Sequence, residues 1–298
     1  MTHVGIVGLG TMGSRFASRL LETGHQVHGT NRHRDRAAAL IARGMTWHDT
    51  PREVAAATEV VISMVTDDAA LAAITEGPDG IVAGLGRGHV YVDMSSVSPR
   101  ASVRTAEVVR ESGADMLDAP VSGSVPQATS GTLTIMVGGD EATFQRVEAL
   151  LRVLGASITR VGDNGAGVTL KLAINISLAV QTLAFSEGLL LAERGGIDPR
   201  LAAEVMVHSP IGSPMLAARV PLLLELPDAA WFPMRLMHKD INLALEQAQR
   251  LGIPIPSAAA AARVLASATE LGYADRDIAG IRAVLSRTGS SSGAAAVA

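Results

Sequence analysis

The feature that most constrains the fold is a glycine-rich loop near the amino terminus. The short apolar run His3–Val7 leads into the pattern G-x-G-x-x-G, and a helical pattern, Ser14–Thr23, follows it. In such a strand–turn–helix unit, the glycines permit a tight turn, a close approach to a pyrophosphate and close packing of helix on strand. The start of the helix favours the phosphate charge. We therefore predict a dinucleotide-binding loop formed by Gly8, Gly10, Thr11, Met12 and Gly13.

The residues after the next predicted strand, Gln26–Thr30, indicate which dinucleotide is bound. An NAD-binding domain typically carries Asp or Glu at this point to hold the ribose hydroxyls, whereas this chain has Asn31, Arg32 and Arg34. Guanidinium groups pair bidentately with phosphate, so these residues favour the 2′-phosphate of NADP. The alternative is that the arginines only solvate the start of a helix. We also expect the cofactor to contact Met64 and Val65, where the predicted strand Val60–Met64 ends.

Strand and helix patterns alternate through the first half of the chain. Expected strands also include 90–94, 114–118, 133–137 and 158–161, with helices at 34–43, 51–57, 68–74 and 98–112 between the earlier strands. This alternation predicts an α/β Rossmann domain over residues 1–163, with a mostly parallel sheet covered on both faces.

The second half has a different pattern. Strand signals end near the Gly-rich segment 162–167, and Ala/Leu-rich helical patterns continue to about residue 287. We predict an all-α domain over 164–287, which begins with a long interdomain helix of about 40 Å from Val168 to Arg194. Such a helix can serve as a spine for two subunits. The small, polar segment 288–298 is predicted to be a disordered tail.

Composition excludes several classes of partner. The net charge of −4 and the absence of a basic run argue against nucleic acid. The chain contains no Cys, so a cofactor must supply any redox chemistry. None of the eight His falls in a metal-binding spacing, and no metal site is predicted. No signal peptide or uninterrupted apolar stretch of about 18 residues is recognised, which predicts a cytoplasmic protein without a membrane span.

Two segments carry candidate catalytic chemistry. The loop Asp118–Ser124 follows a strand and presents small residues whose backbone N–H groups, with the Ser122 hydroxyl, could bind a carboxylate; the alternative is a simple tight turn. Lys171 and Asn175 lie four residues apart, so a helix presents an amine beside an amide. Burial lowers a lysine pKa, which would allow Lys171 to exchange a proton with a substrate oxygen that Asn175 orients. On its own, a lysine at this position is more often a surface residue.

A second charged pair precedes the helical pattern Ile241–Arg250. Lys239 could reach the nicotinamide side of a cleft, and Asp240 could hold Lys171. A plain N-cap role for Asp240 is an equally good interpretation.

Five segments together resemble the β-hydroxyacid dehydrogenase family: GIVGLGTMG, VDMSSVSP, DAPVSGSVPQATSGTLTIMVGG, GAGVTLKLAIN and HKDINLAL. The resemblance implies a Rossmann domain, a helical domain and a homodimer or homotetramer. It implies that Lys171 is the catalytic acid/base with Asn175 as its partner, and that Lys239 and Asp240 close over the cofactor. It assigns substrate binding to Ser96, Ser122, Gly123 and Ser124, with Ser96 also near the nicotinamide.

One position departs from the family pattern. The loop usually reads Ser-Gly-Gly, and Ser124 replaces the last glycine. Related imine reductases share the architecture but generally carry another proton donor in place of the lysine. We therefore expect NADP-dependent hydride transfer to or from a short 3-hydroxy acid or semialdehyde. The alternatives are an imine reductase, which would take an imine in place of a carboxylate substrate, and a non-catalytic NADPH-binding scaffold.

Overall fold

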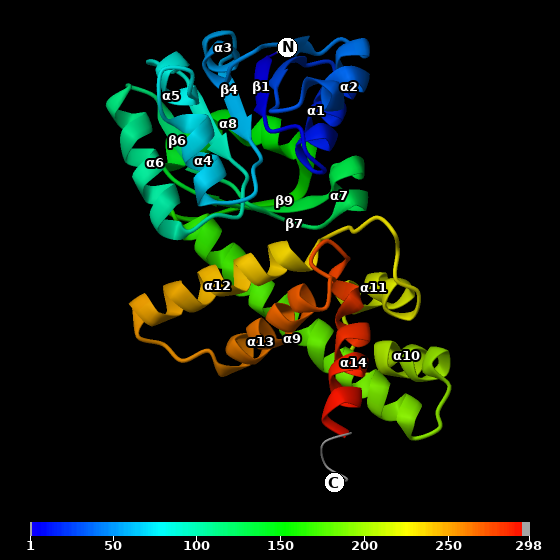
Figure 1. The fold of residues 1–298 in the computed structure, drawn as a ribbon. Coiled ribbons are helices and arrows are strands. Elements are labelled where there is room, and N and C mark those ends of the chain that lie inside the picture. The colour runs from blue at the N-terminus through cyan, green and yellow to red at the C-terminus, as the bar shows by residue number, and fades with distance from the viewer. Residues whose placement is uncertain (1, 294–298) are drawn as a thin grey trace. The chain divides into compact units, whose positions relative to one another are not determined.

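The computed structural model describes residues 2–293 and divides the chain into two compact units (Figure 1). The sheet unit is Met1–Lys171 and the helical unit is Leu172–Ala298. The predicted boundary after residue 163 lies three residues before helix α9, Ala166–Arg194, which begins in the sheet unit and continues into the helical unit.

The sheet unit contains one nine-stranded sheet with the strand order β3-β2-β1-β4-β5-β6-β8-β7, and β9 also pairs with β8. The pairs from β3 to β6 are all parallel, as are β8 and β9, whereas β8 runs antiparallel to β6 and β7. The strands are β1 His3–Val7, β2 Gln26–Thr30, β3 Thr46–Trp47, β4 Val60–Ser63, β5 Val90–Asp93, β6 Asp115–Asp118, β7 Val121–Ser122, β8 Leu133–Gly138 and β9 Gly155–Gly162.

The order 3-2-1-4-5-6 confirms the Rossmann prediction and locates a switch point between β1 and β4, where the chain changes direction across the sheet. Ligands of such sheets bind beyond the carboxyl ends of the strands at this point. The helices of the sheet unit are α1 Gly13–Glu22, η1 Arg34–Ala37, α2 Ala38–Ala42, α3 Pro51–Ala56, α4 Asp68–Thr75, α5 Ile81–Gly84, α6 Pro99–Glu111, α7 Val125–Ser130 and α8 Glu141–Leu154.

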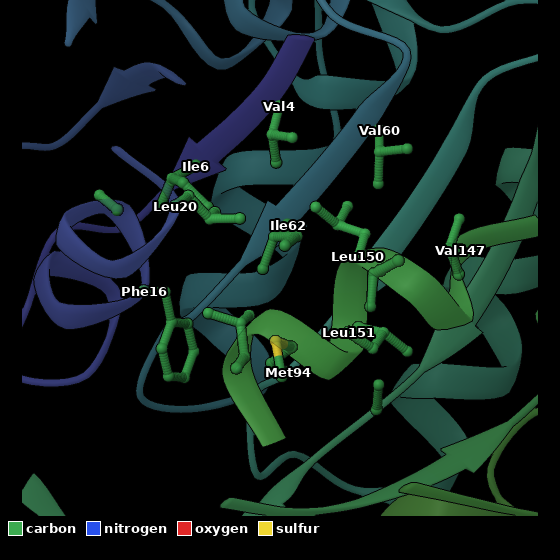
Figure 2. Packing of buried hydrophobic residues seen from close by; sticks show 14 of the residues in the cluster. Val4, Ile6, Phe16, Leu20, Val60, Ile62, Met94, Val147, Leu150 and Leu151 are labelled. Carbon is green, nitrogen blue, oxygen red and sulfur yellow. The ribbon is translucent and has the colours of Figure 1, made fainter. Parts of the chain in front are cut away.

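Alternating residues of the central strands supply two apolar layers, one on each face of the sheet. Val4, Ile6 and Ile62 point to one layer, where they pack with Phe16 of α1 and Leu151 of α8 (Figure 2). The intervening strand residues point to the opposite layer, against α3, α4, α5 and α6. Both faces of the sheet are therefore buried, which explains why these strands are almost continuously apolar.

The described residues of the helical unit form helices only, apart from an isolated bridge between Pro233 and Asp277. Two apolar clusters hold them together. One lies among α9, α12, α13 and α14, and the other among α9, α10 and α11. The helices are α10 Pro199–His208, α11 Pro214–Leu224, α12 Met234–Leu251, α13 Pro256–Glu270, η2 Ile278–Gly280 and α14 Ile281–Gly293.

Two segments differ from the sequence expectations. Helix α14 continues to Gly293, so residues 288–293 of the expected disordered tail are helical, and 294–298 lie outside the described residues. Helix α9 is long and apolar enough to cross a membrane by length and composition alone, a criterion that core helices of soluble proteins also meet. Among the described residues, no other helix meets this criterion.

Candidate active site

The glycine loop joins β1 to α1 at the switch point of the sheet. Gly8 has φ +96°, and a Cβ there would lie 2.4 Å from the carbonyl oxygen of Met64. A Cβ on Gly13 would lie 2.0 Å from the oxygen of Gly8, whereas Gly10 has no neighbour within 4 Å of that position. Gly8 and Gly13 must therefore be glycine, because a side chain at either position would collide with neighbouring backbone atoms. At Gly10 no atom lies near the backbone on this side, which leaves space for a ligand to approach. Helix α1 has no capping side chain and no acidic residue in its first turn, which suits an anion.

Asn31 ties the end of β2 to the glycine loop. Its Oδ1 accepts a hydrogen bond from the Leu9 backbone N–H at 3.2 Å, and its Nδ2 donates to the His33 oxygen at 3.1 Å. The predicted cofactor residue Asn31 therefore has a visible role in shaping the loop.

Arg32 and Arg34 are both exposed beyond the end of β2, and neither has a carboxylate partner among the ion pairs of the described residues. The Arg34 guanidinium lies 5.4 Å from the centre of the Trp47 ring, within cation–π distance. Trp47 is itself held by a hydrogen bond from Nε1 to Asp49 at 2.8 Å. The sequence analysis missed Trp47, because β3 has only two residues and shows no strand pattern.

Met64 and Val65 follow β4 and lie under the glycine loop. The Met64 backbone N–H donates to the Val7 oxygen, and a Cβ on Gly8 would lie 3.4 Å from Val65 Cγ1. The Val65 N–H donates to the Ser95 hydroxyl at 2.9 Å. Ser96, predicted to lie near substrate and nicotinamide, is the half-buried residue next to Ser95.

Asp93 ends β5 beneath these residues and was not among the predicted site residues. It is fully buried, and burial raises its pKa to about 6, while hydrogen bonds from Ser63 and Ser95 oppose the shift. One signal was visible in the sequence: Asp93 is the only charged residue of the apolar run Val90–Met94.

Asp118 ends the next strand, β6, and anchors the start of α9. Its two carboxylate oxygens accept the backbone N–H groups of Gly165 at 2.7 Å and Val168 at 3.0 Å. A Cβ on Gly138 or Gly167 would lie within 2.8 Å of this carboxylate, so both glycines are needed for its approach. Burial raises the pKa of Asp118, and the hydrogen bonds from Gly165 and Val168 oppose the shift. The Asp118 of the predicted loop thus orients the helix that carries Lys171.

The predicted carboxylate loop spans the end of β7 and the start of α7. Ser122 is half-buried, and Gly123 has φ +124°, with Leu133 and Gln127 close to where a Cβ would lie. Ser124 is the N-cap of α7 in a capping box, in which Gln127 Oε1 accepts the Ser124 backbone N–H at 2.9 Å. The side chain that departs from the family glycine therefore has a local structural use in starting this helix.

Lys171 lies in the second turn of α9 and is only 9% exposed. The alternative that Lys171 is a surface residue is therefore wrong, because a lysine in solvent would expose far more of its side chain. Asn175 lies one helical turn further along and is fully buried.

Asn175, Lys239 and Asp240 come together in the helical unit. Asn175 Nδ2 donates to Asp240 Oδ2 at 2.5 Å, and Lys239 Nζ lies 2.8 Å from Asp240 Oδ1. Because the carboxylate can only accept, the Asn175 amide must direct its nitrogen to Asp240 and its oxygen away. That oxygen is buried and has no hydrogen-bond partner among the described residues.

The N-cap interpretation of Asp240 is wrong. Helix α12 begins at Met234, six residues earlier than Asp240, with Pro233 as its N-cap. The helix extends back through His238 because Met234 and Met237 are buried in the helical core, and this packing continues the helical pattern upstream. Asp240 is instead a buried acceptor in the interior of the helix.

The structure thus assembles two groups of predicted residues. In the sheet unit, the glycine loop, Asn31, Met64 and Val65 form one connected set. In the helical unit, Asn175, Lys239 and Asp240 form the other. Among the described residues, no group of three or more His, Asp or Glu is arranged to hold a metal ion.

Comparison with known protein families matches nearly the whole chain in two parts. Residues 3–162 match the family described as the NAD binding domain of 6-phosphogluconate dehydrogenase. Residues 165–285 match the NAD-binding family of NADP-dependent 3-hydroxyisobutyrate dehydrogenase.

Individual proteins give the same picture. The chain is 39% identical to 2-hydroxy-3-oxopropionate reductase of Escherichia coli over 256 residues, which cover 86% of this chain and 87% of the relative. Its fold matches that of Mycobacterium tuberculosis 3-hydroxyisobutyrate dehydrogenase with L-serine, with a TM-score of 0.84, 28% identity and coverage of 96% and 99% of the two chains. An imine reductase from Pseudomonas sp. matches at a TM-score of 0.64 and 23% identity, over 95% of this chain and 99% of that one, which shows a shared fold alone.

Proposed function

The chain belongs to the β-hydroxyacid dehydrogenase family and is an NAD(P)-dependent dehydrogenase that acts on CH–OH groups, and from that premise we propose its cofactor, its substrate class and the roles of its residues. We propose that it uses NADP to interconvert a short 3-hydroxy acid and the corresponding semialdehyde. When bound, the cofactor supplies or accepts the hydride. The E. coli relative, named as a reductase of 2-hydroxy-3-oxopropionate, supports a small carbonyl acid as substrate.

The observation that carries the proposal is the burial of Lys171 one turn before Asn175. In the reductive direction, Lys171 Nζ would donate a proton to the carbonyl oxygen of the substrate. In the oxidative direction, the same nitrogen takes the proton of the alcohol. The free Oδ1 of Asn175 is suited to accept a hydrogen bond from the substrate hydroxyl or from an ammonium group, and Asp240 fixes this orientation. Lys239 and Asp240 are proposed to close over the cofactor, and Ser96, Ser122, Gly123 and Ser124 to bind the substrate carboxylate.

The experiment that tests the acid/base role compares Lys171→Met with Leu170→Ala. Methionine keeps the apolar stem but cannot donate a proton, so we expect turnover to fall by about 10²–10⁴-fold while NADPH still binds. Leu170 is the half-exposed neighbour on the same helix, and its truncation controls for disturbance of α9. Near-normal turnover of Lys171→Met would refute the mechanism.

The preference for NADP rests on the exposed guanidiniums of Arg32 and Arg34, and on the Trp47 ring that holds Arg34 in place. We expect Arg34→Gln to weaken NADPH binding by roughly tenfold and to leave NADH binding nearly unchanged, because only NADPH carries the 2′-phosphate. Arg36→Gln is the matched control, since Arg36 is exposed in the same turn. Equal affinity of the native enzyme for NADH and NADPH would contradict the cofactor assignment.

Imine reduction remains the second candidate activity, and the observation that favours it is Ser124 in place of the usual family glycine, together with Arg32 and Arg34 of the proposed NADP loop. Parallel assays of a semialdehyde and a cyclic imine with NADPH separate the two activities. A higher kcat/KM for the imine would overturn the hydroxy-acid proposal. Absence of turnover with both substrate classes would favour the scaffold alternative.

We further propose a cytoplasmic homodimer or homotetramer that uses α9 as its spine. The exposed positions of α9 recur at helical spacing and are mostly small or apolar, and Leu191 is 77% exposed. Such a stripe is suited to pair with a second copy of itself. Light scattering on a sizing column should report an oligomer for the native chain and more monomer for Leu191→Asp.

A further inference from the structure

A buried hydrogen-bond network lies beneath the loop that follows β4, and it is centred on Asp93. Oδ1 of Asp93 accepts three hydrogen bonds, from the Ser63 hydroxyl at 2.6 Å, the Ser95 hydroxyl at 2.6 Å and the Ser95 backbone N–H at 3.2 Å. All three residues are fully buried. The proposed mechanism gives none of them a role.

The carboxylate determines the direction of every bond in the network. A serine hydroxyl has one proton, and Ser63 and Ser95 both donate it to Asp93. Ser63 must therefore accept at its other side, where the Tyr91 hydroxyl lies 2.7 Å away. Ser95 must also accept, and its partner is the Val65 backbone N–H at 2.9 Å.

The two serines thus differ in what they hold. Ser63 connects Asp93 to Tyr91, which lies in the apolar layer between the sheet and α3 to α6. Ser95 connects Asp93 to the backbone after β4, and this backbone packs against Gly8 so closely that a Cβ there would meet the Met64 oxygen at 2.4 Å. Of the two hydroxyls, only that of Ser95 bonds the backbone of residues 64–65, against which Gly8 packs.

We propose that Asp93 is a positioning residue for the nucleotide-binding loop: through the Ser95 hydroxyl it holds the Val65 N–H, and so fixes residues 64–65 as the support on which Gly8 rests. The proposal depends on the proposed binding of a nicotinamide dinucleotide at this loop. Asp93 contacts neither substrate nor cofactor, since it is fully buried.

The form of the network favours a functional role over simple structural stabilisation. The second oxygen, Asp93 Oδ2, is buried without a hydrogen-bond partner among the described residues, so ionising this group is costly. Burial accordingly raises the pKa of Asp93 to about 6. Because the Asp93 carboxylate accepts hydrogen bonds and does not donate them, the Ser63 and Ser95 hydroxyls must both direct their protons to it. Their lone pairs then face Tyr91 and the Val65 N–H.

The test compares two variants that each remove one buried hydroxyl bound to the same carboxylate oxygen. Ser95→Ala removes the acceptor of the Val65 N–H, and we expect the Kd for NADPH, measured by fluorescence titration without substrate, to rise roughly tenfold. Ser63→Ala is matched in atom type, burial and partner, but it should change the Kd by less than about twofold. Equal effects of the two variants on the Kd would overturn the proposal.

A second pair of variants tests Asp93 itself. Asp93→Asn keeps an oxygen that can accept all three hydrogen bonds, so its Kd for NADPH should stay within about twofold of the native value. Asp93→Val has a similar shape without an acceptor, and it should raise the Kd as Ser95→Ala does. The double variant Asp93→Val/Ser95→Ala should bind no more weakly than either single variant, because both changes break one chain of contacts. Additive effects would contradict the proposal.

The tests of Asp93 can fail independently of the proposed function. If the native protein bound neither NADPH nor NADH, the function would fail, whereas normal binding with indistinguishable Ser95→Ala and Ser63→Ala variants would refute only the role of Asp93. If Asp93→Val did not fold, the comparison of the two serine variants would still decide the question.

Discussion

The end of β5 and the corner between α11 and η2 each bury an aspartate, and the two carboxylates are satisfied in different ways. In the sheet unit, Asp93 receives three hydrogen bonds on one oxygen and none on the other from the described residues, and it has no cationic partner among them. In the helical unit, Asp277 uses both oxygens. Oδ1 binds the Arg219 guanidinium at 2.9 Å and the Ala279 N–H at 3.0 Å, and Oδ2 accepts two backbone N–H groups, those of Trp231 and Phe232.

The difference indicates what each site does for the molecule. Asp277 ties α11, the segment before α12 and η2 together, and its charge is balanced by Arg219, which is only 7% exposed. Asp93 sits in a network without a balancing charge, beside a proposed cofactor loop. A buried charge that is fully compensated is typical of a structural anchor, whereas one that is only partly compensated is more typical of a functional site.

The largest effect on stability is expected when the Asp277–Arg219 ion pair is broken. Asp277→Ala leaves the Arg219 charge buried and three backbone N–H groups without their acceptor, so the free energy of unfolding should fall by about 3–5 kcal/mol. Chemical denaturation measures this change. Arg219→Met, which leaves the three backbone donors in place, should cost less, and the reverse order would contradict the assignment of Asp277 as the anchor.

The next effect concerns the uncompensated charge at Asp93. Because its folded pKa is raised to about 6 from 3.8, the contribution of Asp93 to stability is fully present below pH 3.8 and is lost as the pH rises through 6. Asp93→Asn has no such loss. The stability of the variant relative to the native protein should therefore increase by on the order of 3 kcal/mol between pH 4 and pH 7.

Denaturation curves of both proteins across this pH range provide the measurement. The Tyr91 hydroxyl and the Asp118 carboxylate remain in both proteins, so the difference reports Asp93 together with its charge interactions with these two groups. A difference that stays constant at all pH values would contradict the raised pKa of Asp93.

Asp118 is an intermediate case between the two aspartates. Both its oxygens are used, but by the backbone of the α9 start and not by a cation. Asp118→Ala removes these two acceptors, and at pH 7 we expect a loss of about 1–2 kcal/mol of stability, the range typical of helix-capping aspartates. Hydrogen exchange at Gly165 and Val168 would locate the change, and unaltered exchange there would refute the anchoring role.

The smallest effect is expected at a partly exposed histidine stack in the sheet unit. His28 lies between His3 at 3.2 Å and His48 at 2.9 Å, and partial burial followed by the charges of His48 and His3 lowers its pKa below 6.5. The neutral form is favoured in the fold, so this stability is fully present above pH 6.5 and is lost as the pH falls through the lowered pKa. On acidification, the free energy of unfolding should fall less in His28→Gln than in the native protein. The difference should be below about 1 kcal/mol, because solvent screens charges on exposed groups. Thermal unfolding of both proteins from pH 7.5 to 5.5 would measure this difference. The same dependence of stability on pH in the variant and the native protein would contradict the prediction.

Much of the sheet unit could be predicted because its signals are local. The glycine loop, the helix after it and the alternation of strands and helices follow from residues close together in the chain, and the strand order confirms the Rossmann prediction. The family resemblance is likewise confirmed. Helices α7 and α8 were missed, although both have helix start signals: Ser124 with Pro at the helix start, and Asp140 as an N-cap.

The other errors and omissions concern side chains whose partners are distant in sequence. Asp240 was considered as an N-cap because no local signal shows that Met234 and Met237 extend the helix into the core. Trp47 lies 13 residues from Arg34, and the stacking of the two depends on β3 joining the edge of the sheet beside β2.

The sequence by itself determined the fold class, the glycine loop and the placement of Lys171 and Asn175 one helical turn apart, because turn geometry and helical spacing act over a few residues. Only the tertiary structure decided that Asp240 holds the Asn175 amide, that Asp118 begins α9, and that Asp93 supports Val65 through Ser95. Except for the local Asp93–Ser95 bond, these contacts join residues that lie 30 to 65 positions apart in the sequence. Hydrogen bonds depend on distances of about 3 Å, which only the packing of neighbouring strands and helices can set.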